Sequence, residues 1–537
     1  MIRTHSCTLL ALLAPAIFTA VLTVPAAPAA AQDPEALTNA ARSLWDDDSS
    51  ANREKVRTDM LNAAAGDVKS VLMALKAGPK FNNEVTRGVD QFSFKGRDGQ
   101  AQISGRYIPT TYDASKKMPM LVWLHGGATG ERRDRGTAQV EILKDWCEKA
   151  GIILLAPSAY SGAAWWEFDG AYNVLRSMKL TKGIYNIDEN KTFVAGFSDG
   201  GSGVYWFLDH FGTYFAGGVC ISGHPSVAGA EQAYGQFSYV NLAQRPLLVC
   251  LGGKDRLYPP SRIQPFIDDM TAAGVKVTSK VYAEAGHTTA MIAEALGDME
   301  AFIKSNERNS QRAAVQLQWD GTPALNRVDW LKIDQVREAV TGEPEMADPN
   351  TYIGRAALGC DYDANVVGKL KVTHVTEGSA AAIAGVMVGD TIDRFNTDKV
   401  TSAAQLEQIV NSLQPGTLSH VWVIRDVAGA AEVEEVELIV EFPPARVAFP
   451  RDRVMSSLSA TAEGNHINIK SRGVEKLTVL LPAGMFDQDQ AIVITVNGTV
   501  VHNAKVVINA AFGVNSAAGD RDRGLVYTNS VTVNVPR

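Results

Sequence analysis

The feature that most constrains this chain is a series of short, almost wholly apolar runs between residues 84 and 307. Helical stretches separate these runs, and an alternating segment at 91–109 before them has the character of a β-hairpin. Continuous apolar strands are typical of a parallel sheet buried on both faces, and strand–helix alternation covers both faces with helices. We therefore predict an α/β domain over residues 84–307, with strands at 118–124, 152–156, 192–195, 217–221 and 246–251.

The length of the chain requires further folded units. Its 537 residues exceed what one hydrophobic core supports and correspond to about three or four domains. Apolar positions at helical spacing predict an N-terminal helical segment over residues 32–83, which we expect to cover part of the α/β domain. Residues 308–349 read as a β segment followed by a linker.

Two modules follow the linker. The pattern over residues 350–444 predicts a compact α+β segment that ends at Pro443-Pro444. Residues 445–537 alternate like half-buried strands, and this pattern predicts an all-β, sandwich-like module. Because strands of the same kind precede the α+β segment, one hypothesis is that residues 315–333 and 460–535 form a single sandwich into which this segment is inserted. The predicted fold class is therefore multidomain.

The first 31 residues read as an export signal. Arg3 lies in a short basic region, an apolar run follows at 8–24, and Ala29-Ala30-Ala31 offers the small residues that a signal peptidase requires. The alternative is an uncleaved membrane anchor, but Pro15 interrupts the apolar run. We expect cleavage, a secreted or periplasmic location, and no membrane span after signal removal.

Charge and cysteine content exclude several classes of protein. A net charge of -8 with no Lys/Arg cluster argues against nucleic acid as a partner. The four cysteines after the signal are not spaced as a stapled scaffold or a metal site, so we expect free thiols, no metal and no cofactor. They are Cys147, Cys220, Cys250 and Cys360.

Ser198 is the candidate nucleophile. Gly196-Phe197-Ser198-Asp199-Gly200 matches the G-x-S-x-G pattern, which places a serine on a tight turn between a strand and a helix. The pattern alone is weak in a glycine-rich chain, but here an apolar strand precedes it and residues 202–210 can form the helix. The alternative is a glycine-rich turn with an incidental serine.

A serine nucleophile needs a histidine to accept its proton and a carboxylate to orient that histidine. In the strand–turn–helix context of G-x-S-x-G the chain order is serine, acid, histidine. His287 follows Ser198 within the α/β domain, and Asp255 lies directly after the apolar strand at 246–251, which makes these two the candidates. A surface histidine is the alternative for His287, and Asp268 and Asp269 are less suitable acids because they fall within a helical stretch.

The oxyanion of an acyl-transfer reaction is best stabilised by two backbone N–H groups. We assign one to Asp199, the residue after the nucleophile, and the other to Gly127 in His125-Gly126-Gly127, with Ala128 as the alternative. Trp165 and Trp166 follow a strand that ends at the same sheet edge, so they are candidate walls of a substrate pocket. Inward-packed loop aromatics are the equal alternative.

With these motifs in order, residues 84–307 resemble secreted esterases of the α/β-hydrolase superfamily, nearest to polyhydroxybutyrate-depolymerase-like, feruloyl-esterase-like and prolyl-oligopeptidase-like catalytic domains. The likeness is strongest from Tyr185-Asn186-Ile187-Asp188-Glu189-Asn190-Lys191 into the Ser198 motif. It implies a Ser198, Asp255 and His287 triad and a small-molecule or polymeric ester as substrate. The chain has no room for the β-propeller of oligopeptidases.

Residues 352–442 resemble a bacterial PDZ domain. The resemblance rests on Leu358-Gly359, on the Ala384-Gly385 and Gly389-Asp390 pairs of one phrase, and on a helix at 402–413. It implies docking of a peptide or protein ligand along a sheet edge. The turn at 352–359 that would bind a terminal carboxylate departs from the usual glycine-rich phrase.

Three functions compete at this point. The first is an exported serine hydrolase that cleaves carboxylic esters, the second is a serine peptidase on the α/β-hydrolase fold, and the third is a non-catalytic binding or scaffold protein. Trypsin-like proteases with PDZ domains present histidine, aspartate and then serine, whereas this chain presents Ser198, Asp255 and then His287. The order favours the first function and keeps the second as the alternative.

Overall fold

The computed structural model describes residues 32–46, 49–230, 233–338, 340, 351–352, 358–363, 366, 368–411, 413, 417–427, 430–439, 446–449 and 454–536. The predicted export signal lies outside these residues. Among the described helices, none has the length and apolar character needed to cross a membrane.

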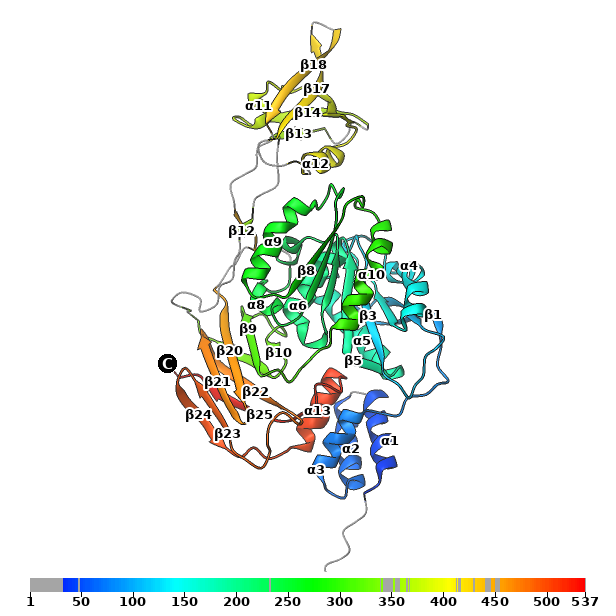
Figure 1. The fold of residues 1–537 in the computed structure, drawn as a ribbon, viewed down its shortest axis with the longest axis vertical. Helices are drawn as coiled ribbons and strands as arrows, with labels where there is room; N and C mark the ends of the chain where they lie inside the picture. The colour runs from blue at the N-terminus through cyan, green and yellow to red at the C-terminus, as the bar shows by residue number, and fades with distance from the viewer. Residues whose placement is uncertain are drawn as a thin grey trace, which may run out of the picture.

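An eight-stranded sheet forms the centre of the molecule (Figure 1). Its order is β1-β2-β4-β3-β5-β6-β7-β8, with an antiparallel hairpin at one edge and parallel pairing from β4 to β8. The predicted hairpin and the five predicted strands are therefore confirmed. The strands are β1 Gly88–Lys95, β2 Ala101–Ile108, β3 Met118–Leu124, β4 Ile153–Pro157, β5 Ile187–Phe197, β6 Gly218–Ile221, β7 Leu247–Gly252 and β8 Val277–Tyr282.

Helices cover both faces of this sheet, because its central strands are apolar on both sides. The helices α4 (Arg135–Ala150) and α10 (Ala290–Ser305) pack on one face, while α5 (Phe168–Ile184), α6 (Asp199–Phe211) and α9 (Pro260–Ala272) pack on the other. The shorter elements α7 (Pro225–Ala228), η1 (Gly212–Tyr214) and α8 (Tyr239–Leu242) also lie between strands of this domain. The result is the α/β architecture that the apolar runs predicted.

Two further antiparallel-rich sheets combine strands from both sides of the 350–444 segment. The strand β9 pairs with β20 and β11 pairs with β22, which is the pairing that the single-sandwich hypothesis requires. The sheets run β24-β23-β21-β20-β9 and β10-β11-β22-β25. Their strands are β9 Ala314–Trp319, β10 Arg327–Val328, β11 Leu331–Val336, β20 Ser456–Glu463, β21 His466–Arg472, β22 Val474–Pro482, β23 Ile492–Val496, β24 Thr499–Ala504 and β25 Tyr527–Asn534.

The C-terminal part is not all-β, contrary to the prediction. A helix, α13 (Ala510–Asp520), lies between β24 and β25 and packs against the N-terminal helices α1 (Pro34–Asp46), α2 (Ser50–Ala63) and α3 (Val68–Ala77). Small residues allow this close packing, since a Cβ at Gly513 would lie 2.3 Å from Leu72. The N-terminal helices thus pack mainly against α13, although Arg42 also donates to the carbonyl oxygen of Gly183 in the α/β domain.

The middle segment has a core of its own. Its sheet runs β13-β14-β15-β17-β18, β16 pairs with β15, and the helices are α11 (Ala380–Ile383) and α12 (Ala403–Asn411). The strands are β13 Cys360–Tyr362, β14 Leu370–Val375, β15 Thr391–Phe395, β16 Asp398–Lys399, β17 Leu418–Val427 and β18 Ala430–Ile439. Its identification as a PDZ domain stays a prediction, and most of the turn at 352–359 lies outside the described residues.

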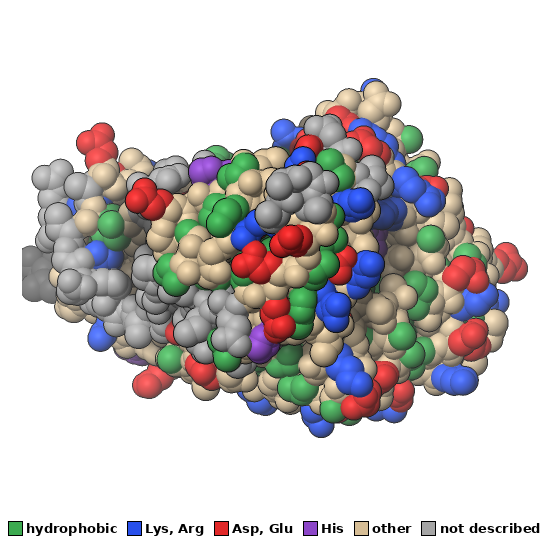
Figure 2. Space-filling model, turned by 90° about the horizontal axis from the view of Figure 1, so that it is seen from above, with side chains coloured by type: hydrophobic (Ala, Val, Ile, Leu, Met, Phe, Trp, Pro, Cys, Tyr) green, Lys and Arg blue, Asp and Glu red, His purple; other side chains and the backbone are tan. Residues whose placement is uncertain are grey.

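The middle segment extends from one end of the molecule (Figure 1). At its base, β12 (Thr351–Tyr352) pairs with β19 (Arg446–Val447), and the next residues insert Phe449 into the α/β domain, where its ring lies 4.5 Å from Phe237. Seen from that end, acidic and basic side chains are interspersed over the surface (Figure 2). The segment also approaches the α/β domain through an exposed ion pair between Asp398 and Arg256, at 3.4 Å.

Candidate active site

Ser198 occupies a strained turn between β5 and α6. Its φ of 57° lies in the left-handed region, which a residue other than glycine rarely adopts. The flanking glycines are required sterically, because a Cβ at Gly196 would lie 2.4 Å from the backbone of Gly200, and a Cβ at Gly200 would lie 1.8 Å from the carbonyl oxygen of Leu124. The motif therefore forms the sharp elbow that its sequence predicted, at the N-terminus of α6.

The structure brings Ser198, His287 and Asp255 together. The Nε2 atom of His287 lies 2.9 Å from the Oγ of Ser198, and its Nδ1 atom lies 2.8 Å from a carboxylate oxygen of Asp255. A carboxylate can only accept at this position, so Nδ1 donates its proton to Asp255 and Nε2 is left to accept the proton of Ser198. The three groups form one directed chain of hydrogen bonds.

Backbone contacts hold the acid and the histidine in register. Asp255 is 1% exposed, and its second carboxylate oxygen accepts hydrogen bonds from the N–H groups of Leu257 and Tyr258 at 2.9 and 2.8 Å. The turn before Asp255 also bonds to the turn before His287, since Lys254 donates its N–H to the carbonyl oxygen of Ala285. Asp255 thus stays an oriented acceptor for the imidazole.

Two aromatic rings contact His287 that the sequence did not single out. Phe197, inside the serine motif, lies 5.2 Å from the imidazole centroid, and Tyr258 meets it edge-on at 5.4 Å. Tyr258 also lies 5.3 Å from the ring of His224. In the sequence these two rings stand out only because they lie close to Ser198 and Asp255. A motif search does not use this closeness.

The loop after β3, to which we assign one oxyanion donor, lies beside Ser198. A Cβ at Gly126 would come within 3.1 Å of the Ser198 Cβ, a tight contact that a glycine avoids. Gly127 has a φ of +66°, and a side chain there would also collide with Arg135. The N–H of Gly127 and that of Asp199 at the start of α6 remain our assigned donors.

The Asp199 side chain has a contact that the sequence did not predict. One of its carboxylate oxygens accepts a hydrogen bond from the N–H of Ala128 at 2.9 Å. On the other side of the loop, Arg135 donates to the carbonyl oxygens of Gly126 and Gly127. Because Ala128 already donates to Asp199, we keep Gly127 rather than Ala128 as the oxyanion donor.

His125 is a packed residue of this loop. It is 1% exposed, its Nδ1 donates to the carbonyl oxygen of Gly126 at 2.9 Å, and its Nε2 accepts from the N–H of Ala159 at 3.0 Å. Burial lowers its pKa to about 4, so the ring is neutral near pH 7. His125 therefore supports the structure of the loop.

Trp165 and Trp166 are both buried, at 0% and 3% exposure. The indole N–H of Trp165 donates to the carbonyl oxygen of His125 at 2.9 Å, and its ring packs 5.0 Å from that imidazole. Both rings therefore face the protein interior. The role of these residues as walls of a substrate pocket stays a prediction.

Cys147, Cys220, Cys250 and Cys360 are free, and the first three are buried. Burial raises the pKa of Cys220 to about 12, which keeps this thiol protonated. Within the described ranges, no group of three or more His, Cys, Asp or Glu side chains is arranged to hold a metal ion.

Comparison with known proteins gives partial similarities. No family model matches the chain. A bifunctional acetylxylan esterase/xylanase from Neocallimastix patriciarum is 26% identical over 143 residues, which is 26% of this chain and 20% of that protein. The chain therefore spans about a fifth of the length of this curated relative.

Two solved structures are similar over part of the chain. A thermostable esterase is 20% identical, covers 41% of this chain and 63% of its own, and gives a TM-score of 0.34. The S-formylglutathione hydrolase of Staphylococcus aureus is 18% identical, covers 41% of this chain and 99% of its own, and also gives a TM-score of 0.34.

Proposed function

We propose that this protein is an exported serine hydrolase that cleaves carboxylic esters through an acyl-enzyme. The observation that carries the proposal is the directed chain from Ser198 through His287 to Asp255, with links of 2.9 and 2.8 Å at a strained elbow. A buried acceptor, an oriented imidazole and a hydroxyl at a helix N-terminus together suit acyl transfer.

The proposed reaction has two steps. His287 accepts the proton of Ser198 as the hydroxyl attacks the ester carbonyl, and Asp255 stabilises the imidazolium that forms. The N–H groups of Gly127 and Asp199 stabilise the oxyanion, and His287 then donates its proton to the leaving alcohol. Water, activated by His287 in the same way, releases the acid from Ser198.

Two features favour an ester over an amide. The curated relative that shares 143 residues with this chain carries an esterase in its name. An alcohol is also a better leaving group than an amine. A site with one histidine and two backbone donors therefore supplies the stabilisation needed to expel the leaving group more easily for an ester than for an amide. Peptide hydrolysis on the same triad is the second candidate.

The middle segment is proposed to act as a PDZ domain that docks a peptide or protein. The support is its own core, a six-stranded sheet and a helix, α12, flanking a hollow of about 430 Å³ beside β13. An extended peptide that adds to the edge of β13 would bring substrate-bearing partners close to the α/β domain.

The deciding experiment compares the full chain with its Ser198→Ala variant. Both are incubated with p-nitrophenyl esters of graded acyl length and with a series of peptide p-nitroanilides. We expect ester cleavage that falls on the order of 10⁴-fold or more in Ser198→Ala. Ser161→Ala, at an exposed serine of the same domain, is the matched control and should retain activity.

Each other result has a definite meaning. No cleavage above background by the wild type on any substrate would reject the mechanism and favour a non-catalytic protein. Ser198-dependent cleavage of the amides without cleavage of the esters would promote the peptidase. Wild-type rates in both Ser198→Ala and Ser161→Ala would show that another group performs the hydrolysis.

A further inference from the structure

A line of aromatic rings connects the base of the middle segment with the triad. We call the paired strands β12 and β19 the stem, and Phe449 follows the stem directly after Ala448. The ring of Phe449 is 2% exposed, and it lies 4.5 Å from Phe237 and 5.4 Å from Tyr239. The part of the chain that leaves the middle segment is therefore anchored in the core of the α/β domain.

From Phe449 the line of rings continues through α9 to His287. Phe449 lies 6.3 Å from Phe266 on α9, and Phe266 meets the imidazole of His224 edge-on at 5.0 Å. His224 lies 5.3 Å from Tyr258, which meets His287 edge-on at 5.4 Å. Each step lies within the range of about 4.5–7 Å at which aromatic rings attract one another. The imidazole of His287 is thus connected with Phe449 by continuous ring packing.

Phe449 also supports the backbone that carries His224. The short helix α7 begins after His224, which is its N-cap, and ends before Gly229. Phe449 covers this end of the helix so closely that a Cβ at Gly229 would lie 2.3 Å from its ring. A change at Phe449 therefore reaches His224 both through α9 and through α7.

The imidazole of His287 needs more than Asp255 to stay in place. Asp255 holds Nδ1 at 2.8 Å, but Nε2 reaches the nucleophile only if rotation of the ring about that bond is also restricted. Tyr258 contacts the imidazole edge-on and restricts this rotation. Tyr258 is 7% exposed and rests in turn against His224. The position of Tyr258 therefore depends on the rings behind it.

We propose that Phe449 is a positioning residue for His287, so that the stem of the middle segment helps to set the geometry of the triad. This role rests on the proposed function, in which His287 is the general base, and it gives the attachment of the middle segment a part in the rate. Phe449 touches no reacting group and acts through His224 and Tyr258. Packed rings transmit a displacement, because a truncated buried ring leaves a cavity into which its neighbours move only in part.

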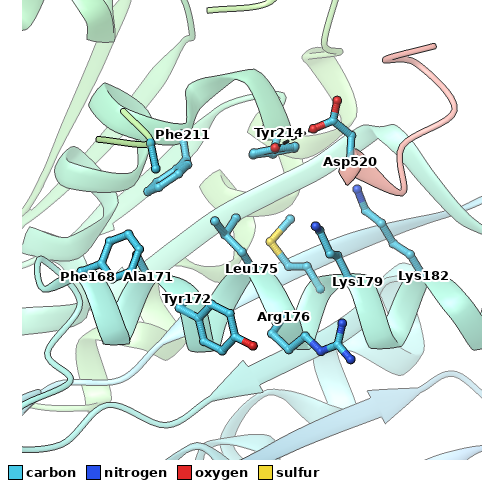
Figure 3. Close-up of a pocket in the computed structure, with 12 residues that line it drawn as sticks. Phe168, Ala171, Tyr172, Leu175, Arg176, Lys179, Lys182, Phe211, Tyr214 and Asp520 are labelled. Carbon is cyan, nitrogen blue, oxygen red and sulfur yellow. Dashed lines mark hydrogen bonds between the residues drawn. The ribbon is translucent and has the colours of Figure 1, made fainter. Parts of the chain in front are cut away.

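The test measures kcat and KM for a p-nitrophenyl ester in the full-length Phe449→Ala protein. We expect kcat to fall about tenfold and KM to stay within about twofold of the wild-type value, because the triad geometry changes and the substrate contacts do not. Phe449→Leu keeps an apolar side chain against Gly229 and should recover most of the rate. The matched control is Phe211→Ala, which truncates a buried ring of the same core that lines a separate cavity of about 230 Å³ along α5 (Figure 3). This control should keep the wild-type kcat.

A double-mutant cycle tests whether the effect passes through Tyr258. Tyr258→Ala removes the ring that contacts His287, so adding Phe449→Ala to it should lower kcat by about twofold or less. Thermal unfolding confirms that each variant is folded at the assay temperature. The proposal is overturned if Phe449→Ala keeps the wild-type kcat, if Phe211→Ala loses as much, or if Phe449→Ala causes the same loss with and without the Tyr258 ring.

A readout without catalysis separates the positioning role from the proposed function. The Hε1 NMR resonance of His287, assigned by its loss in His287→Gln, is recorded in protein with isotope-labelled histidine. Phe449→Ala should shift this resonance because the Tyr258 ring beside it moves, whereas Phe211→Ala should leave it in place. If the wild type cleaves no ester, the proposed function fails and the resonance decides. A shift in Phe449→Ala alone then supports the positioning role, and a resonance that is unchanged, or that shifts equally in Phe211→Ala, overturns it.

Discussion

The triad edge and the ionic junction below it are built from different kinds of sequence information. The triad edge is the edge of the central sheet that carries Ser198, Asp255 and His287. Its groups come from residues 125–287, and short sequence motifs identify them. The junction, which we define as Lys182, Glu189, Arg308, Asp522 and Arg523, joins residues up to 340 positions apart through buried ion pairs of 2.6 to 3.2 Å. On our proposal the first region is organised for reaction, whereas the second holds separate units together.

This difference predicts that one region can fail without the other. Substitutions of Ser198, His287 or Asp255 should change the rate and leave the fold intact, because the backbone turns of the triad edge are held by glycine contacts and N–H donors. Substitutions at the junction should change the free energy of unfolding and leave the rate of the folded protein intact, because an unpaired buried charge is costly.

The largest expected effect is a fall in the rate of ester hydrolysis in the Asp255→Asn variant. The amide can donate to Nδ1 and so favour the wrong imidazole tautomer, in which Nε2 carries the proton and cannot accept one from Ser198. We expect kcat for the ester substrate to fall roughly 10⁴-fold, with unchanged urea unfolding. The control is Asp268→Asn on α9, an exposed carboxylate that accepts from Gln264, and equal rates for the two variants would contradict the assignment.

The junction should show the opposite behaviour in Asp522→Asn. Asp522 is fully buried and is shared by Arg308 and Lys182, so the variant leaves two cations with one neutral partner. We expect a loss of about 3–5 kcal/mol in the free energy of unfolding, measured by urea, and a kcat close to that of the wild type.

Asp59→Asn, in the exposed pair with Lys55 on α2, is the matched control for the junction and should cost about 1 kcal/mol or less. A large fall in kcat for Asp522→Asn without loss of stability would remove the separation between the two regions.

The same contrast explains what the sequence could predict. The apolar runs located the strands of the central sheet, and Gly196 and Gly200 were readable because a tight turn or a close approach requires glycine there. The pairing of β9 with β20 could only be a hypothesis, since alternation shows a strand but not its neighbour.

Other features were not predictable because no local pattern carries them. The helix α13 lies in a segment whose small residues suit a helix only because α2 and α3 cover it. Arg308 pairs with Asp522, which lies 214 positions later in the chain. The sequence does not show whether charged residues like these are buried in an ion pair or exposed to solvent. The contact between Asp199 and Ala128 likewise depends on two loops meeting at the sheet edge.

A smaller effect is expected from the Asp199 side chain, which positions the oxyanion loop without touching the substrate. Asp199→Ala removes the acceptor of the Ala128 N–H, so we expect kcat to fall about 10- to 100-fold with little change in KM. Asp199→Asn keeps a carbonyl oxygen in the same place and should recover most of the rate. Equal losses in the two variants would show that the carboxylate charge, and not the hydrogen bond, is required.

The last prediction concerns acid stability, and it also separates the two regions. Burial lowers the pKa of His125 to about 4, below the ordinary value of 6.5, so between these values the unfolded chain binds a proton that the folded protein does not. Stability must then fall as the pH falls from about 6.5 to about 4, by up to about 1.4 kcal/mol per pH unit. Asp522, whose pKa the neighbouring Arg308 and Lys182 lower despite its burial, loses its contribution as the pH falls through the ordinary carboxylate pKa and below it.

Urea unfolding of the wild type and His125→Asn between pH 7.5 and 4.5 tests this order. The variant should be less stable throughout but should lose less stability as the pH falls, since it has no buried imidazole to protonate on unfolding. His466→Asn, at an exposed histidine of β21, should keep the wild-type slope. If His125→Asn keeps that slope as well, the prediction fails, and the acid sensitivity arises at another group such as His210, whose pKa burial also lowers to about 4.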